Sequence, residues 1–308
     1  MPTFCRHNRL VQNCTICARE QNLEARPVVS SSAPKVSQPG DRAGQAATPR
    51  EPGSPKPTTR AAANNLRVRR LARGVEDGYR SQLLPGLKSS DDAARLAQEL
   101  AFATRRLSLM EQVAAAEPAG VVPEVWQQIA APGDIDKRTL LATRHVLGGP
   151  RGIHDDNRLE ESLAGIEAWG ARQGSLAQAF IGEASWTSER RFERTFERLG
   201  SIGLDRDPRY ELLTTLGRLG VYALRPAKLF LRGENEATWA AKRMLGIGDP
   251  LLLNSRAVDL AQACQTPLEA LDLAFHNWGA GKRVGGGLPE DAEGDELVLD
   301  RARSVFGL

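Results

Sequence analysis

Two glycine-containing turns in the C-terminal half carry residue types that can bind phosphate. The first is Gly217-Arg218-Leu219-Gly220, and the second is Gly246-Ile247-Gly248, with Asp249 directly after it. Each turn is preceded by one amphipathic segment and followed by another. A short glycine hairpin between two helices presents backbone N–H groups, and such groups bind the phosphates of nucleic acid without reading its sequence. The pattern predicts two phosphate-binding hairpins.

Four potential metal ligands lie close together near the N-terminus. They are Cys5, His7, Cys14 and Cys17. Two closely spaced ligand pairs of this type are what a tetrahedral zinc site requires. Nothing else in residues 1–20 can form a core, so the metal would supply the folding energy. We expect a structural Zn²⁺ knuckle that docks a protein partner; the alternative is a tail with unpaired cysteines.

Composition sets wide limits on function. The chain has 308 residues and a formal charge of +3, which by itself argues little for a nucleic-acid partner. Local basic groups say more, because clustered charges act through the field that they create. Arg190 and Arg191 form one such group, and Lys242 and Arg243 precede the second hairpin. Solvated helix faces are the alternative interpretation.

The chain also has no apolar run of membrane-spanning length and no signal-peptide pattern. We therefore expect a cytoplasmic protein without a membrane partner.

The chain divides into four parts by composition. Residues 1–20 are the expected knuckle, and residues 21–65, rich in Pro, Ser, Ala, Thr and Gly, read as a disordered linker that cannot bury enough surface to fold. Residues 66–283 are expected to form a helical domain. Residues 284–308 are expected to be a loose acidic tail with a short last helix at Leu297–Phe306.

The helical domain is predicted from apolar residues at three- and four-residue spacing, without a convincing alternating strand pattern. The sequence therefore predicts an all-α fold. The expected helices are Leu66–Tyr79, Asp91–Gln112, Val122–Ala130, Arg138–His145, Leu159–Gln173, Leu176–Ile181, Thr187–Leu199, Pro208–Leu219, Ala223–Phe230, Ala237–Leu245, Pro250–Ala263 and Pro267–Phe275.

These motifs resemble a known family. Leu245-Gly246-Ile247-Gly248 resembles a shortened form of the Leu-Pro-Gly-Val-Gly hairpin of helix-hairpin-helix DNA glycosylases, in which an Asp opens a following helix. Over Leu66–Gly279, and with the Cys/His head, the chain resembles the alpha-glutamyl/putrescinyl thymine pyrophosphorylase-like proteins. The segments that carry this second resemblance are 183–187, 216–222, 248–253 and 276–279.

The resemblance implies a glycosylase-like helical body that acts on hypermodified pyrimidines in double-stranded phage DNA. Three features depart from the glycosylase pattern. The spacing from hairpin to Asp is short, no Lys of the bifunctional type lies next to the hairpin, and the four-cysteine iron–sulfur loop is missing. The short spacing leaves open which residue is the catalytic carboxylate. The missing Lys favours hydrolysis without a lyase step.

The resemblance implies that a carboxylate stabilises the positive charge that builds on the sugar as the glycosidic bond breaks. Asp249 is the first candidate, with Asp272 and Glu183 as alternatives. Asp249 followed by Pro250 is also a common way to cap a helix.

An enzyme of this kind must extrude its target base and stack it on aromatic side chains. The candidates for this base pocket are Trp186, Tyr222 and Trp278, with Asn277 to read the Watson–Crick edge and Trp239 as a further aromatic. Each aromatic residue also suits a position in the core.

The expected function is that of a monofunctional DNA glycosylase, a hydrolase for modified pyrimidines in antiviral defence. One alternative is a non-catalytic DNA-binding or scaffold protein that keeps the hairpins as phosphate clamps. Another is an enzyme of modified-thymine biosynthesis. The glycosylase and the scaffold differ in whether the candidate carboxylates face a pocket.

The ligand spacing predicts one zinc ion per chain. Elemental analysis of the purified protein should find one equivalent of zinc, and Cys14→Ser should lose it because a tetrahedral site needs all four ligands. Circular dichroism should show an unchanged helical content. The site is excluded if Cys14→Ser keeps its zinc.

Overall fold

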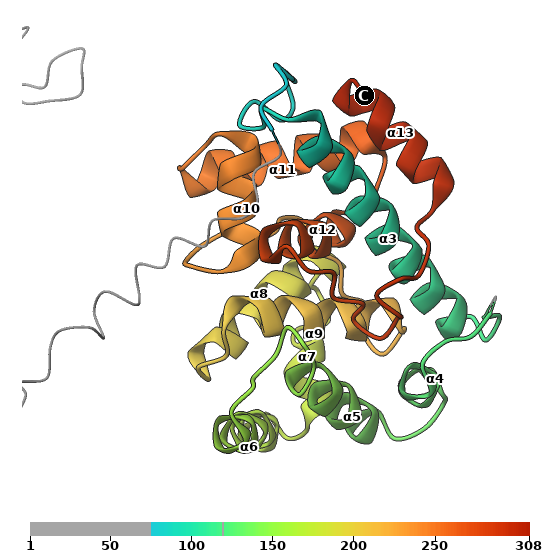
Figure 1. Cartoon of the computed structure of the whole chain (residues 1–308). Helices are drawn as coiled ribbons and strands as arrows, with labels where there is room; N and C mark the ends of the chain where they lie inside the picture. Colours follow the sequence, from blue (N-terminus) through green and yellow to red (C-terminus); the bar gives the residue numbers. More distant parts are fainter. Residues whose placement is uncertain (1–74, 119) are drawn as a thin grey trace, which may run out of the picture. The chain divides into compact units, whose positions relative to one another are not determined.

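The structure is a computed structural model that describes residues 75–118 and 120–308. Within these ranges the regular elements are all α-helices, which confirms the all-α prediction (Figure 1). The expected zinc knuckle and linker lie outside the described residues. The helices are α3 (Ser90–Ala114), α4 (Glu124–Ala130), α5 (Ile135–Leu147), α6 (Asp156–Arg172), α7 (Leu176–Ile181), α8 (Ser188–Ser201), α9 (Arg206–Arg218), α10 (Glu236–Leu245), α11 (Pro250–Cys264), α12 (Leu268–Ala280) and α13 (Glu296–Phe306).

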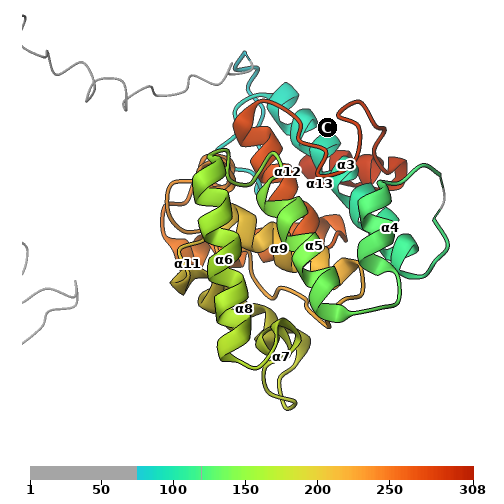
Figure 2. The ribbon, with the colours of Figure 1, turned by 90° about the horizontal axis from the view of Figure 1, so that it is seen from below.

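Helix α12 is the centre of one half of the body. All its residues from Glu269 to Gly279 are buried, and it packs between α3 and α10 (Figure 1). A side chain at Gly279 would meet the carbonyl oxygen of Glu236 at 2.7 Å, so this glycine lets α12 and α10 approach closely. The other half contains α5 to α9, with α5 against α9 (Figure 2).

Short polar side chains fix where many of the helices begin. The caps accept hydrogen bonds from backbone N–H groups of the first turn, which have no partner within the helix. These capping residues are Asp134, Asp155, Ser175, Thr187, Asn235, Asp249 and Asp295. The helix starts are therefore encoded locally, as the sequence patterns indicate.

Two of the expected helices are wrong where the structure describes them. Ala223–Phe230 is irregular chain between α9 and α10. Pro226 explains this, because proline lacks an N–H and disfavours helical backbone at the residue before it. Leu224, Leu229 and Phe230 are nevertheless buried, and the segment is tied to α8 by the hydrogen bond that Arg225 N donates to the Ser188 carbonyl at 3.4 Å.

The described end of the expected helix Leu66–Tyr79 is also not helical. The Asp77 carboxylate accepts hydrogen bonds from the backbone N–H groups of Tyr79 and Ser90, both at 2.9 Å. These bonds hold a turn, and a side chain that binds nearby backbone N–H groups competes with helix formation.

The C-terminal segment, expected to be loose, lies against α3. Arg106 Nε donates to the carbonyl of Gly286 at 3.1 Å, and Asp295 N donates to the carbonyl of Ala101 at 3.1 Å. In α13, Val298, Ala302 and Phe306 are buried. The acidic tail is thus part of the helical body. None of the helices in the described ranges is both long and apolar enough to cross a membrane.

Gly86 sets the distance between the segment before α3 and the end of α10. Its N–H donates to the Met244 carbonyl at 2.9 Å, and an added Cβ would overlap the Arg243 carbonyl oxygen. Gly86→Ala should therefore lower the free energy of unfolding by about 1–3 kcal/mol, the usual range for overpacking. Urea denaturation measures this.

Gly248 provides the matched control for Gly86. A Cβ there would meet nothing within 4 Å. Gly248→Ala should change the free energy of unfolding by less than about 0.5 kcal/mol. Equal effects of the two substitutions would contradict the close packing at Gly86.

Candidate functional site

The second glycine turn forms a true hairpin between two helices. Helix α10 ends at Leu245, Gly246 adopts a left-handed conformation at φ 66°, and α11 begins at Pro250. Ile247 packs partly against the core, whereas Gly248 is exposed with open space around it. No described backbone acceptor binds the N–H groups of Ile247 and Gly248. These two donors can therefore bind an anion such as a phosphate.

Asp249 serves as the N-cap of α11. One oxygen of its carboxylate accepts from Leu251 N at 2.9 Å and from Leu252 N at 3.0 Å. The side chain is exposed and Pro250 occupies the first helical position. These contacts give Asp249 a structural role, because it caps the start of α11.

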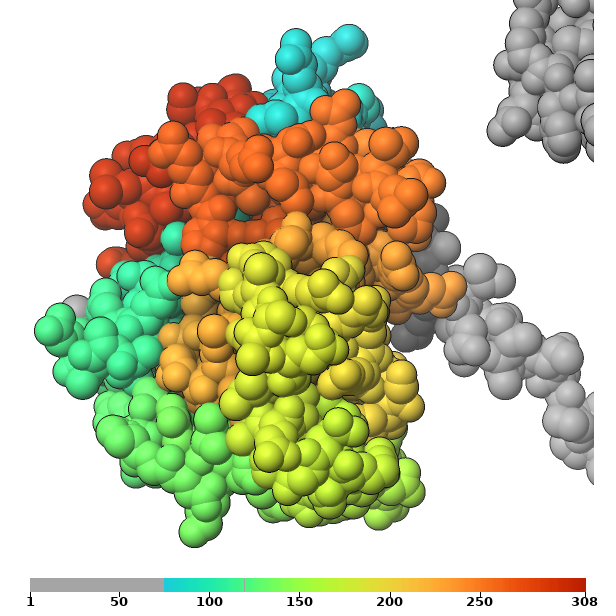
Figure 3. All heavy atoms as spheres, turned by 180° about the vertical axis from the view of Figure 1, so that it is seen from behind, coloured from blue at the N-terminus to red at the C-terminus, as the bar shows by residue number. Residues whose placement is uncertain are grey.

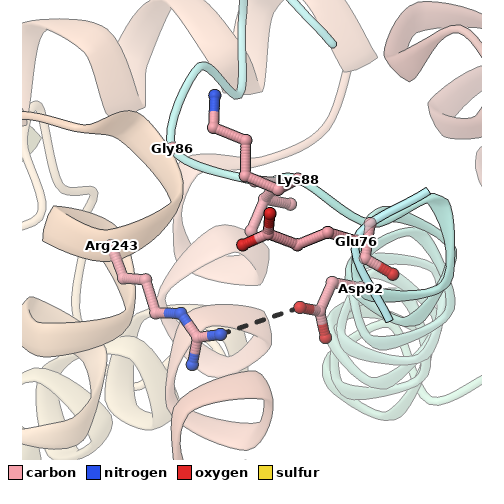
Figure 4. Close-up of a pocket in the computed structure, with 7 residues that line it drawn as sticks. Glu76, Gly86, Lys88, Asp92 and Arg243 are labelled. Carbon is pink, nitrogen blue, oxygen red and sulfur yellow. Dashed lines mark ion pairs between the residues drawn. The ribbon is translucent and has the colours of Figure 1, made fainter. Parts of the chain in front are cut away.

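A cavity of about 260 Å³ lies beside the hairpin (Figure 4). Arg243 reaches into it from α10 toward Asp92 of α3, with 3.8 Å between their charged atoms. Glu76 and Lys88 also line it. Lys88 is exposed, as is Lys242 on α10, so cationic side chains border the hairpin.

The first glycine turn is not a phosphate-binding hairpin. No helix follows it, and the N–H groups of Val221 and Tyr222 are taken by the Leu216 carbonyl. A side chain at Gly217 would meet the Leu224 carbonyl oxygen at 2.5 Å. Arg218 is paired with Glu269 at 2.8 Å and also with Glu111. Gly217, Gly220 and Arg218 therefore stabilise the fold, which corrects the expectation from sequence.

The two neighbouring arginines of α8, Arg190 and Arg191, have different roles. Arg191 donates to the backbone carbonyls of Ile181, Trp186 and Ala223 at 2.7–3.1 Å and so ties α8 to its neighbours. Arg190 is exposed. Only Arg190 of this pair is placed to meet a partner.

A cluster of buried charges lies between α9 and α12. We call it the charge cluster; it consists of Arg106, Arg151, Arg206, Asp207, Glu211, Asp272 and His276. Arg151 lies 2.7 Å from Asp272 and 2.9 Å from Glu211. Arg206 lies 3.0 Å from Asp207, and His276 Nδ1 lies 3.2 Å from it.

The charges of this cluster stabilise one another. Burial alone would raise the pKa of Asp207, but the hydrogen bond with His276 and the charges of Arg151 and Arg206 hold it well below the usual value. Burial likewise opposes ionisation of Glu211, yet Arg106 and Arg151 lower its pKa. Three arginines face three carboxylates, so the cluster is charge-balanced when all six groups are ionised.

The charge cluster borders two cavities. A cleft of about 530 Å³ lies between the start of α9 and the loop before α10, and Arg151, Arg206, Asp207 and Arg232 are among its lining residues. A small cavity of about 40 Å³, lined by His145 and Glu211 among others, lies on the second side. Burial lowers the pKa of His145. Arg151 lines both cavities.

The three carboxylates expected to act on substrate are not brought together. Asp272 has a side chain only 1% exposed and is ion-paired with two arginines. Glu183 lies exposed in the turn before α8, and Asp249 caps α11. None of the three lines the cleft or the two smaller cavities. Among the three carboxylates of the charge cluster, Asp207 lines the large cleft and Glu211 lines the small cavity.

The residues expected to form a base pocket are packed in the core. Trp186 and Trp278 are buried, and the Trp278 indole donates to the Asp92 carbonyl at 2.9 Å. Tyr222 stacks on Phe180 at 5.2 Å, and burial raises the pKa of Tyr222 to about 12.

Asn277 is held by side-chain and backbone partners. It donates to Glu99 at 2.9 Å and accepts from Val284 N at 3.0 Å. Like the three aromatics, it lines none of the three cavities. Only Trp239, which is 40% exposed, remains on the surface among the aromatic candidates.

Sequence reasoning missed most of the charge cluster. The available signal was two pairs of ionisable residues, each four positions apart and therefore on one face of a helix: Asp207 and Glu211 on α9, and Asp272 and His276 on the mostly apolar α12. Charged residues buried on a core-facing side need partners, so such pairs point to a buried network.

Comparison with known proteins adds no further constraint. No protein-family model, curated protein or solved structure matches this chain. Cys5, His7, Cys14 and Cys17 lie outside the described residues. Within the part of the chain that the structure describes, no group of three or more His, Cys, Asp or Glu side chains is arranged to hold a metal ion.

The charge cluster predicts a loss of stability in acid. The folded pKa values of Asp207 and Glu211 lie below the ordinary values of 3.8 and 4.5. Their contribution is therefore fully present above those values and is lost as the pH falls through the folded pKa values. The free energy of unfolding, measured by urea denaturation, should fall steadily below about pH 4.5.

Glu211→Gln tests the origin of this acid dependence. The variant should be about 3–5 kcal/mol less stable at neutral pH, because removing one partner leaves buried charge uncompensated. It should also show a shallower fall of stability in acid than the wild type. An acid dependence identical to that of the wild type would mean that Glu211 does not contribute to it.

Proposed function

We propose that this protein binds double-stranded DNA through the α10–α11 hairpin and removes modified pyrimidine bases from phage DNA by hydrolysis, as a glycosylase-like enzyme of antiviral defence. The observation that carries this proposal is the hairpin at Gly246–Gly248, which joins two helices and in which the N–H groups of Ile247 and Gly248 have no backbone acceptor among the described residues.

The surroundings of the hairpin support contact with a DNA backbone. Gly248 has no atom within 4 Å of an added Cβ, so a phosphate can approach the main chain closely. The exposed side chains of Lys242 and Lys88 add positive charge nearby, whereas the N-terminus of α11 is already capped by the Asp249 carboxylate. Such contacts position a duplex and supply affinity independent of base sequence.

Excision of a base requires a cavity and an ionised carboxylate. The cleft of about 530 Å³ lies in the range of small-molecule sites, and a carboxylate of the charge cluster borders it. Charge on the sugar in the transition state is stabilised when such a group is held in a site that excludes water. The cleft and the carboxylate at its border support the proposed reaction.

A second candidate function is that of a non-catalytic DNA-binding scaffold. It is favoured by the positions of Asp249, Asp272 and Glu183, because none of them lines any of the three described cavities. In this case the hairpin clamps phosphate, and the N-terminal zinc knuckle that we propose docks a protein partner. DNA binding is common to both candidates, whereas base release belongs to the enzyme alone.

DNA affinity tests the part that both candidates share. Binding to duplex DNA should weaken by about 0.9 log unit per log unit of salt for each phosphate neutralised. Gly248→Glu should lower the affinity at least about tenfold, because a carboxylate would repel the phosphate at the hairpin. It should also reduce the slope of log affinity against log salt by about 0.9, the value for one phosphate contact. Fluorescence anisotropy at several salt concentrations measures both quantities.

Gln262→Glu is the matched control. It adds the same charge at an exposed site on α11, roughly 20 Å along the helix from the hairpin at 1.5 Å per residue. That distance exceeds the screening length of about 8–10 Å. Equal weakening by both variants, or binding that does not depend on salt, would contradict the hairpin as the phosphate site. Abasic sites formed in phage DNA of known modified-base content distinguish the enzyme from the scaffold.

A further inference from the structure

We infer that the cleft between α9 and α10 receives the extruded base, and that Asp207 is the carboxylate that faces the sugar. This inference rests on the proposed function and names its catalytic residue. None of the residues first expected from the sequence occupies this position.

Asp207 differs from the other candidate acids in its access to a cavity. Its side chain is 12% exposed and lines the cleft, whereas the Asp272 side chain is 1% exposed and is enclosed by Arg151 and Arg206. Glu211, with a side chain 9% exposed, lines only the smaller cavity of about 40 Å³. Among the carboxylates of the charge cluster, Asp207 is therefore the one that a ligand in the large cleft can reach.

The contacts of Asp207 fix both its charge and its direction. Arg206 binds Oδ1 at 3.0 Å and His276 Nδ1 lies 3.2 Å from Oδ2. Each carboxylate oxygen has two acceptor sites, so these contacts leave capacity for a water or a sugar hydroxyl. Because Arg151, Arg206 and His276 keep the pKa of Asp207 low, the group remains negative and is a poor proton acceptor.

These properties suit electrostatic stabilisation of the reaction. The bond between C1′ and the base nitrogen breaks, and its electron pair leaves with the base. Positive charge on the sugar faces the fixed negative charge of Asp207. A water oxygen then bonds to C1′; one proton of that water stays on the new hydroxyl and the other is taken up by the departing base.

Helix α10 connects the cleft with the hairpin. Arg232, Gly233, Glu234 and Asn235, which line the cleft, directly precede α10, and the hairpin directly follows it. Ten residues of helix span about 15 Å at 1.5 Å per residue. This length corresponds to about four steps of a DNA strand at 3.4 Å each.

In Figure 3 the yellow segment that contains α8 borders the orange segment that contains α10 and α11. For this inference, one duplex must contact the hairpin with its backbone while a nucleotide about 15 Å away, the length of α10, enters the cleft.

The decisive experiment compares two isosteric substitutions in the same charge cluster. Asp207→Asn and Asp272→Asn each remove one buried negative charge, but only Asp207 lines the cleft. Single-turnover base release from modified phage DNA should fall at least about 10²-fold in Asp207→Asn, the usual scale for one positioned electrostatic group. The DNA affinity of Asp207→Asn should stay within twofold of the wild-type value, a margin of about 0.4 kcal/mol in binding free energy.

Asp272→Asn should lose stability in the same way but keep at least about a tenth of the wild-type rate in its folded fraction. Rates are compared at a temperature where thermal denaturation shows each variant to be folded. Equal loss of rate in both variants would overturn the role of Asp207, because the loss would then reflect damage to the cluster. Full activity of Asp207→Asn would overturn it as well.

A surface variant keeps the inference testable if Asp207→Asn does not fold. Arg232 is exposed at the rim of the cleft, so Arg232→Glu should fold and should raise the DNA concentration at half-maximal rate about tenfold or more. The same charge reversal at exposed Arg303 on α13 is the control. Equal effects of the two reversals would overturn the cleft as the base site. Absence of base release by the wild type on every modified DNA overturns the proposed enzyme, and this inference with it.

Discussion

The balance of buried charge between α9 and α12 is the constraint on which the rest of the body depends. Asp272 and Glu211 are enclosed by helices and would be costly to ionise alone. Arg151 binds both of them, and it comes from the loop between α5 and α6. Because one guanidinium connects α9, α12 and that loop, the two halves of the helical body are held in one arrangement. Arg106 extends the same network to α3, and its Nε holds the C-terminal segment through the Gly286 carbonyl.

That arrangement also sets the geometry of the surfaces that can meet a ligand. Helix α12 is buried along nearly its whole length, and Gly279 allows α10 to pack closely on it. With α10 fixed in this way, the chain before it borders the cleft and the chain after it forms the hairpin. Gly86 holds the hairpin end of α10 through its hydrogen bond to the Met244 carbonyl. The hairpin and the cleft are thus joined by a single helix, α10.

The same residue types have different roles at different depths. Arginines on the surface, such as Arg190, carry charge that a polyanion can meet. Arg191 and Arg218 instead bind carbonyls and carboxylates of the protein itself, so they add to the fold and not to a binding surface. Aromatic residues divide in the same way, since Trp278 is enclosed and Trp239 is 40% exposed. A basic or aromatic residue therefore indicates a binding site only after its partners are known.

The sequence by itself determined the all-α class, most of the helix boundaries and the hairpin at Gly246, because periodicity, capping and turn residues act over a few neighbouring positions. It predicted α7 at Leu176–Ile181 with the bounds that the structure has. It placed a helix at Ala223–Phe230, where Pro226 and contacts to distant chain decide otherwise. Asp249 followed by Pro250 also indicated a helix cap, whereas only the tertiary structure decided that Asp272 is enclosed and that Asp207 borders a cleft. The physical reason is that the partner of a buried charge is chosen by packing: Arg151 and Asp272 are 121 positions apart in sequence and 2.7 Å apart in space.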